Sequence, residues 1–179
     1  MRTPALSVRN LRIWFESGSN RNHVVDDISF DILPGEATGL VGESGCGKSM
    51  TALAILGLLP AAEIKTSCSS IEVNGTDISR LNQAQRRNIL GRDIAMIFQQ
   101  PGTALDPVFT IGSLIGATYR RHFGGNKQLI RQTVLDSLDS VGFANPEQIA
   151  AAYPHQLSGG MRQLAMIAMA MVCKPSVVI

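Results

Sequence analysis

The octapeptide Gly-Glu-Ser-Gly-Cys-Gly-Lys-Ser at residues 42–49 most constrains what this chain can fold into. It fits the pattern G-x4-G-K-[ST] and separates a short apolar run, residues 37–41, from a longer one, residues 51–59, that has no polar face. We expect the first run to be a strand and the second a fully buried helix that Pro60 stops. Glycines let the backbone curl so that its N–H groups, with the positive end of the helix, stabilise phosphate oxygens. The sequence therefore predicts a phosphate-binding loop between a strand and a helix.

The polar side chains of this loop have distinct expected roles. Lys48 is expected to reach the β and γ phosphates as a point charge, and Ser49 to hold Mg²⁺, a hard ion that prefers oxygen ligands. The nucleotide-binding residues predicted here are Gly42, Glu43, Ser44, Gly45, Cys46, Gly47, Lys48, Ser49 and Met50. Cys46 occupies a variable position of the pattern and is given no redox role. The loop by itself does not separate ATPases, GTPases and small-molecule kinases.

Composition narrows the class of protein. The 179 residues are 45% hydrophobic and 17% charged, which is typical of a globular chain. A net charge of +2 argues against a non-specific nucleic-acid binder, so no nucleic-acid partner is expected. No apolar run reaches the roughly 20 residues that a bilayer requires. Three widely spaced cysteines indicate a reducing compartment rather than a disulfide framework.

Alternating apolar residues and turn signals predict the other elements. Strands are expected at residues 11–15, 28–32, 94–98 and 177–179, with a loop at 16–22, a turn at 33–36 and a hairpin turn at Asn74-Gly75. A helix is expected at residues 129–141, ended by Gly142, and a short one follows the N-cap residue Asn145. A last helix is expected at residues 161–173, where an apolar residue at nearly every position predicts full burial. Residues 100–125 show only weak periodicity.

A second motif, Leu157-Ser158-Gly159-Gly160-Met161, lies at the start of the last predicted helix. A serine and two glycines at a helix start form another anion-binding terminus. One small domain rarely needs two such termini for a single triphosphate. We therefore expect the loop of one copy to meet Ser158, Gly159 and Gly160 of another, with the nucleotide between them.

These motifs together resemble the nucleotide-binding domain of an ATP-binding cassette (ABC) transporter. Residues 42–49 resemble its Walker A loop, residues 157–161 its signature motif, and Gln99 the Q-loop glutamine that contacts Mg²⁺ and the attacking water. The phrases Met-Ile-Phe-Gln-Gln-Pro at 96–101 and Tyr-Pro-His-Gln-Leu-Ser-Gly-Gly-Met-Arg-Gln at 153–163 are most similar to the importer branch for di- and oligopeptides, nickel and related solutes. Met161, Leu164 and Gln100 depart from the common residues.

The resemblance implies an α/β fold with an incomplete P-loop NTPase core, an antiparallel β subdomain and an α-helical subdomain. It places the β subdomain and core at residues 1–99, the helical subdomain at 100–160, and the signature helix with the start of the Walker B strand at 161–179. It implies an ATPase that binds ATP and Mg²⁺, with Lys48 and Gln99 as catalytic residues and Ser49 and Gln99 as metal ligands.

The resemblance also implies the partners. These are a second ATP-binding subunit, identical or not, transmembrane permease subunits and, indirectly, an extracytoplasmic solute-binding protein. The subunit would lie peripherally on the cytoplasmic face of the inner membrane. Its helical subdomain would receive a short helix of the permease. Phe109, Ile111, Leu114 and Ile115 are expected to pack that subdomain, with lining of the docking groove as the alternative.

Residues 174–179 match the approach to the Walker B strand, and the general-base glutamate that follows it in the family is absent. We therefore expect a fragment or a truncated product that binds ATP without hydrolysing it, and an isolated chain of marginal stability because strands at 37–41, 94–98 and 177–179 would be buried on both faces. A GTPase or kinase is the other alternative, but it leaves residues 157–160 unexplained.

The family also stacks adenine on an aromatic residue near the first hairpin. Trp14 or Phe15 is the expected stacking residue, and strand alternation places them on opposite faces, so that only one of them faces the nucleotide. His23 is a further alternative.

Overall fold

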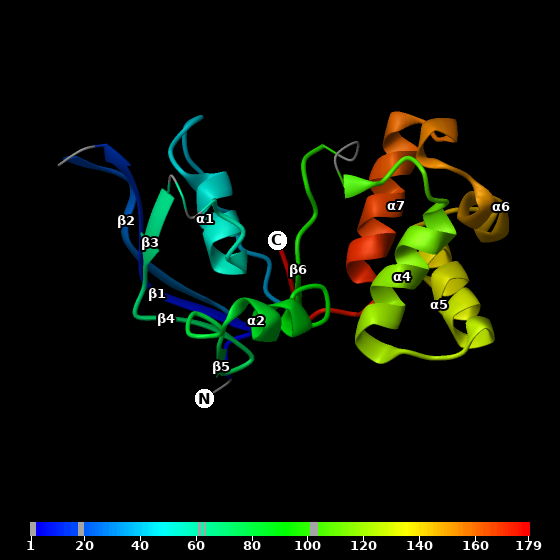
Figure 1. Cartoon of the computed structure of the whole chain (residues 1–179), viewed down its shortest axis with the longest axis horizontal. Coiled ribbons are helices and arrows are strands. Elements are labelled where there is room, and N and C mark those ends of the chain that lie inside the picture. The colour runs from blue at the N-terminus through cyan, green and yellow to red at the C-terminus, as the bar shows by residue number, and fades with distance from the viewer. Residues whose placement is uncertain (1–2, 18–19, 61, 63, 101–103) are drawn as a thin grey trace. The chain divides into compact units, whose positions relative to one another are not determined.

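The computed structural model describes residues 3–17, 20–60, 62, 64–100 and 104–179. The chain divides into two compact units, Met1–Arg87 and Asn88–Ile179, and each is described by itself (Figure 1). The subdomain boundaries expected after residues 99 and 160 stay predictions. In the described part of the chain no helix is long and apolar enough to cross a membrane.

The first unit is built on an antiparallel sheet in the order β2-β1-β4-β5, with β3 also paired to β1. Its strands are β1 (Leu6–Ser17), β2 (Asn20–Ile32), β3 (Ile64–Ser67), β4 (Ser70–Val73) and β5 (Thr76–Asp77). Leu6 and Val8, and then Leu11 and Ile13, are buried as alternate residues of β1. An irregularity in the pairing with β2 between Val8 and Leu11, where Asn10 has a φ of 50°, keeps both pairs on the buried side.

The strands predicted at residues 11–15 and 28–32 are confirmed, but the loop expected at residues 16–22 is wrong for the described residues 16, 17 and 20–22. β1 and β2 continue to pair through Phe15 with Asn22, Glu16 with Arg21 and Ser17 with Asn20. Residues 18 and 19 lie outside the described residues. The polar composition suggested a loop, yet the ladder pairs backbone groups whatever the side chains are.

The hairpin between β4 and β5 is confirmed. Asn74 and Gly75 have φ values of 51° and 76°, the two positive angles that a type I′ turn requires. The turn at residues 33–36 is also confirmed, since the N–H of Glu36 donates to the carbonyl of Leu33 at 3.0 Å.

The expectation of a strand at residues 37–41 is wrong for this structure. These residues adopt no strand, and Leu40 and Val41 are 55% and 92% exposed. A strand forms only where a neighbouring backbone completes its hydrogen bonds. No described segment pairs with residues 37–41, and composition alone could not reveal that.

Helix α1 (Lys48–Leu56) follows, and it ends earlier than expected. Gly57, at φ 66°, closes it through bonds from the N–H of Gly57 to the carbonyl of Ala54 and from the N–H of Leu58 to that of Leu53. The prediction that Pro60 ends the helix is therefore wrong: a glycine in the left-handed region stops it first. Residues 57–59 of the fully buried helix expected at 51–59 therefore lie outside α1, and Leu58 is 48% exposed.

The described part of the second unit is mainly helical, with α4 (Ile111–Phe123), α5 (Lys127–Ser140), α6 (Pro146–Ala151) and α7 (Gly159–Met171). A short 3-10 turn (η1, Pro154–Gln156) precedes α7, and α2 (Gln83–Ile89) spans the division between the units. β6 (Ile94–Ala95) and β7 (Val177–Val178) pair in parallel, shorter than the strands expected there.

Helix α4 is not predicted from the sequence, because residues 100–125 show only weak periodicity. Ile111 and Ile115 are one turn apart and fully buried against Leu138, Ala165 and Ala168. α5 and α6 are confirmed. The full burial expected for the last helix is wrong, because only one face of α7 is covered and Met171 is 39% exposed.

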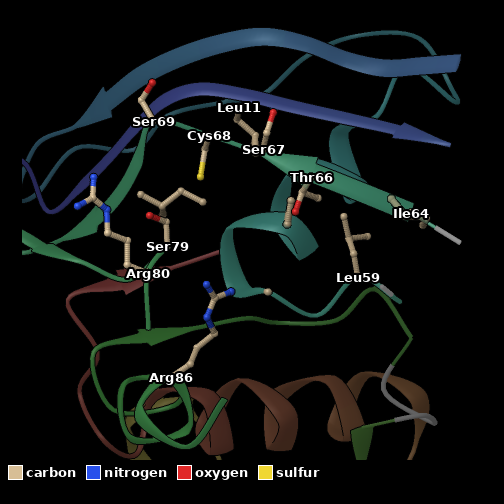
Figure 2. Close-up of a pocket in the computed structure, with 13 residues that line it drawn as sticks. Leu11, Leu59, Ile64, Thr66, Ser67, Cys68, Ser69, Ser79, Arg80 and Arg86 are labelled. Carbon is tan, nitrogen blue, oxygen red and sulfur yellow. The ribbon is translucent and has the colours of Figure 1, made fainter. Parts of the chain in front are cut away.

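A cavity of about 540 Å³ lies inside the first unit, under β3 and beside the end of α1 (Figure 2). Figure 2 shows the thiol of Cys68 and the guanidinium of Arg86 pointing into this space. Nη2 of Arg86 donates to the carbonyl of Ile78 at 2.8 Å. A Cβ built on Gly57 would overlap Nη1 of Arg86. The positive charge thus sits at the C-terminal end of α1, where it is favourable.

We predict that Gly57→Ala lowers the free energy of unfolding by about 1–3 kcal/mol, because alanine is strained at positive φ and also displaces Arg86. In an Arg86→Ala background the same change should cost clearly less, since only the backbone strain remains. Urea denaturation of the four proteins measures this. An equal loss of stability in both backgrounds would show that the position of Arg86 does not depend on the absence of a side chain at residue 57.

Candidate nucleotide-binding site

The loop at residues 42–49 encloses the ammonium of its own lysine. Nζ of Lys48 donates to the carbonyl of Gly42 at 2.7 Å and to that of Glu43 at 2.6 Å, and lies 3.5 Å from Sγ of Cys46. No carboxylate lies within ion-pair distance of Lys48 among the residues that the structure describes. Its charge is therefore held inside the loop by neutral acceptors and remains available to an anion.

The start of α1 offers N–H groups to the same place. Gly45 and Gly47 have φ values of 85° and 93°, and Gly47 is the N-cap of the helix. Within the described residues no side chain caps this end, and the first turn contains no acidic residue. The first N–H groups of a helix have no partner inside it. Together with Lys48 they fit the phosphate groups of a nucleotide.

Gly47 is also fixed from outside the loop. A Cβ built on it would lie 2.7 Å from Cγ2 of Val25 and 3.2 Å from the carbonyl oxygen of Val24, both on β2. Only a glycine allows β2 to approach this closely. Val24 and Val25 therefore help to position the loop. Sequence reasoning did not find them, because nothing in a valine pair in a strand signals such a contact.

Ser49 and Met50 occupy the next positions of α1. Ser49 is exposed and Met50 is half-buried. Mg²⁺ in phosphate sites takes only one or two protein oxygens and keeps waters and phosphate oxygens as its other ligands, so the hydroxyl of Ser49 fits this ion. The described residues contain no group of three or more His, Cys, Asp or Glu that could hold a metal alone.

Gln99 and the serine–glycine turn belong to the second unit. Gln99 is exposed in a bend after β6. Ser158 is the N-cap of α7, and its Oγ accepts from the N–H of Met161 at 3.3 Å. Gly159 and Gly160 are exposed, and a Cβ built on either would meet no described atom within 4 Å. The helix start predicted as a second anion-binding terminus is therefore present and accessible, and its binding of an anion stays a prediction.

The two aromatic residues proposed for adenine stacking differ in their surroundings. The Trp14 ring lies 5.7 Å from the ring of His23, and the Arg21 guanidinium lies 5.5 Å from its centroid. Nε1 of Trp14 is buried without a hydrogen-bond partner in the described part of the chain. Phe15 is 38% exposed. Trp14 is thus engaged with β2 side chains and Phe15 is more accessible, while the choice between them stays a prediction.

Two glycine variants test how the loop is positioned. We predict that Gly47→Ala destabilises the chain more than Gly45→Ala, by roughly 1–3 kcal/mol. Both positions have positive φ, but only Gly47 is crowded by Val24 and Val25, whereas around Gly45 no described atom would touch the new Cβ. Chemical denaturation provides the comparison, and equal losses would mean that contact with β2 does not fix the loop.

Comparisons with known proteins agree with this geometry. Residues 25–179 match the family described as ABC transporter. The dipeptide transport ATP-binding proteins of Escherichia coli and Bacillus subtilis are each 44% identical over 174 residues, 97% of this chain, and the chain spans about half the length of both, 53% and 52%. A dimeric ATP-binding cassette in a post-hydrolysis state bound to ADP and Pi has the same fold, with a TM-score of 0.82 and 23% identity over 97% of this chain and 72% of that one. The chain belongs to the ABC transporter family.

Proposed function

We propose that this chain is the ATP-binding part of an ABC importer that couples ATP binding and hydrolysis to the uptake of peptides or related small solutes, such as nickel or opine-like compounds. The observation that carries this proposal is the loop at residues 42–49, with its lysine held inside and an uncapped helix start beside it. The names of the similar dipeptide transport proteins support a peptide as solute.

In this proposal the nucleotide phosphates lie against the N–H groups of the loop. Lys48 balances the charge of the β and γ phosphates, Ser49 and Gln99 contribute oxygen ligands to Mg²⁺, and Phe15 or Trp14 stacks on the adenine. Main-chain N–H groups that are fixed before binding need no rearrangement, so the phosphates are bound at low entropic cost. Gln99 also relays the state of the nucleotide to the membrane subunits.

A second ATP-binding subunit completes the site. Ser158, Gly159 and Gly160 of one subunit cover the nucleotide bound at the loop of the other, whether the two subunits are identical or not. The exposure of both glycines supports this role, and the related cassette of known structure is dimeric. ATP binds the closed pair more tightly than the open one and shifts the population toward it.

Membrane subunits are the other proposed partners. The second unit, Asn88–Ile179, called the helical unit below, has a groove that could hold part of them. A cavity of about 510 Å³ lies between α4, α5 and α6, with Gly116, Ile130 and Val134 among its lining residues. Its charged lining residues are Arg120, Lys127, Arg131 and Glu147. We propose that it receives a cytoplasmic helix of the permease, with the chain lying peripherally on that face of the inner membrane and a solute-binding protein acting outside.

Three of the four residues first considered for this docking surface pack the subdomain, as expected, but Phe109 does not. Ile111 and Ile115 are fully buried in the core of the helical unit, and Leu114 packs partly against it. Phe109 is 52% exposed and does not line the groove.

The nucleotide proposal predicts that Lys48→Ala abolishes ATP binding, because the charge that balances the phosphates is lost. Lys65→Ala, which removes a lysine of β3, should leave binding unchanged. ATP at 100 times its dissociation constant should raise the free energy of unfolding of the native chain by about 2.7 kcal/mol, and not that of Lys48→Ala. Calorimetric titration and denaturation measure both effects. Unchanged affinity of Lys48→Ala would remove the assignment of the loop.

The docking proposal predicts that the double variant Arg120→Glu, Arg131→Glu weakens association with the membrane subunits by about tenfold, because it reverses the charge of the groove. Arg121→Glu, next to Arg120 but outside the groove, is the matched control. Co-purification with the permease measures association, and ATP binding should be the same in all three proteins. Equal association of the double variant and the native protein would place the membrane partner elsewhere.

A further inference from the structure

A third cavity, of about 560 Å³, lies within the helical unit between α4, α5 and the end of α7. None of its lining residues belongs to the phosphate loop, the serine–glycine turn or the groove between α4, α5 and α6. Its volume is typical of sites for small molecules. The function proposed above gives this cavity no role.

One part of its wall is apolar and partly open to solvent. The rings of Tyr119 and Phe123, one turn apart on α4, lie 5.0 Å apart between centroids. Phe123 is 50% exposed, and Met171, from the end of α7, is 39% exposed. Large apolar side chains that remain exposed around one cavity indicate a surface that a ligand covers.

The serine and threonine hydroxyl groups of the cavity already donate to backbone carbonyls of the protein. Oγ1 of Thr133 donates to the carbonyl of Leu129 at 2.9 Å, and Oγ of Ser137 donates to that of Ala168 at 2.8 Å. Oγ of Ser140 donates to the carbonyl of Ser137 at 2.7 Å. Polar recognition of a ligand is therefore left chiefly to the charged side chains.

Those charged side chains are Asp136 of α5 and Lys174, which follows α7. In the described part of the chain neither forms an ion pair, with the other or with a third residue. Oδ1 of Asp136 accepts from Nε2 of Gln132 at 2.7 Å, which leaves its other oxygen available. Lys174 has a φ of 52°, and its N–H donates to the carbonyl of Met171 at 2.8 Å, so its backbone is fixed beside the cavity.

We propose that this cavity binds a small zwitterion with an apolar side chain, that is, a hydrophobic amino acid or short peptide. Its ammonium group pairs with Asp136 and its carboxylate with Lys174, while the side chain packs against Tyr119, Phe123 and Met171. Two opposite charges that do not pair with each other, beside an apolar wall, are complementary to such a molecule. This is a solute site on the ATP-binding chain itself, and it goes beyond the proposed function.

The probes are the dipeptide alanyl-phenylalanine, its N-acetylated form, which lacks the ammonium group, and its C-terminal amide, which lacks the carboxylate. The variants are Asp136→Asn and Lys174→Asn, the latter chosen because asparagine tolerates positive φ. Asp139→Asn is the control, since Asp139 is on α5 but does not line the cavity. Calorimetric titration gives the dissociation constant of each pair.

We expect Asp136→Asn to weaken binding of the free dipeptide by about tenfold, because the variant loses the carboxylate that pairs with the ammonium group. Binding of the N-acetylated form should be unchanged by this substitution, because that probe has no ammonium group to pair with Asp136. Lys174→Asn should behave in the same way toward the C-terminal amide. Asp139→Asn should bind all three probes as the native chain does. No binding of the dipeptide to the native chain, or equal effects on all three probes, would overturn the proposal.

ATP titration of the same proteins separates this inference from the proposed function. Native ATP affinity without dipeptide binding would refute the zwitterion site alone. Dipeptide binding that follows the expected pattern, in a chain that binds no ATP, would refute the nucleotide proposal and leave the zwitterion site standing.

Discussion

The close approach of β2 to Gly47 is the contact on which the proposed nucleotide site depends. At φ 93° and with Val24 and Val25 against it, this residue has no room for a side chain. The same backbone angle begins α1 and turns its first N–H groups toward the loop. Lys48 follows directly and is drawn back over the loop by two carbonyl groups. One glycine thus links the sheet, the helix start and the lysine, because interiors packed at crystal-like density transmit such constraints.

The starts of the helices differ in how their first N–H groups are satisfied. Thr110, Asn126 and Asn145 cap α4, α5 and α6 with side-chain oxygens that accept from the N–H three residues on. These caps satisfy groups that would otherwise lose their partners on folding. At α1 Gly47 supplies no such oxygen, and at α7 Ser158 occupies the N–H of Met161 while Gly159 and Gly160 stay exposed. Of these five helices, only α1 lacks a side-chain cap in the described part of the chain. The start of α7 is capped like those of α4, α5 and α6, and it is available to a ligand through its two exposed glycines.

In the helical unit a tightly packed core lies beside the groove and the third cavity. Ile111, Ile115 and Leu138 are fully buried, and the hydroxyl of Ser137 ties α5 to the backbone of α7. A Cβ built on Gly112 would lie 2.8 Å from the carbonyl oxygen of Ala150, so α4 and α6 approach closely. The core fixes α4 and α5 firmly enough that different faces of these helices line the groove and the third cavity. Both proposed binding surfaces therefore depend on the same packing.

The sequence by itself determined the features that are local. The phosphate loop, the Asn74-Gly75 turn, the Asn145 cap and the Ser158 turn are each set by residues within a few positions of one another, through φ preferences and short-range hydrogen bonds. Only the tertiary structure decided the rest. It leaves residues 37–41 unpaired, forms α4 around Ile111 and Ile115, and brings Val24 and Val25 to Gly47. Each of these outcomes depends on a partner distant in sequence, and a pattern of neighbouring residues does not specify which distant group will be there.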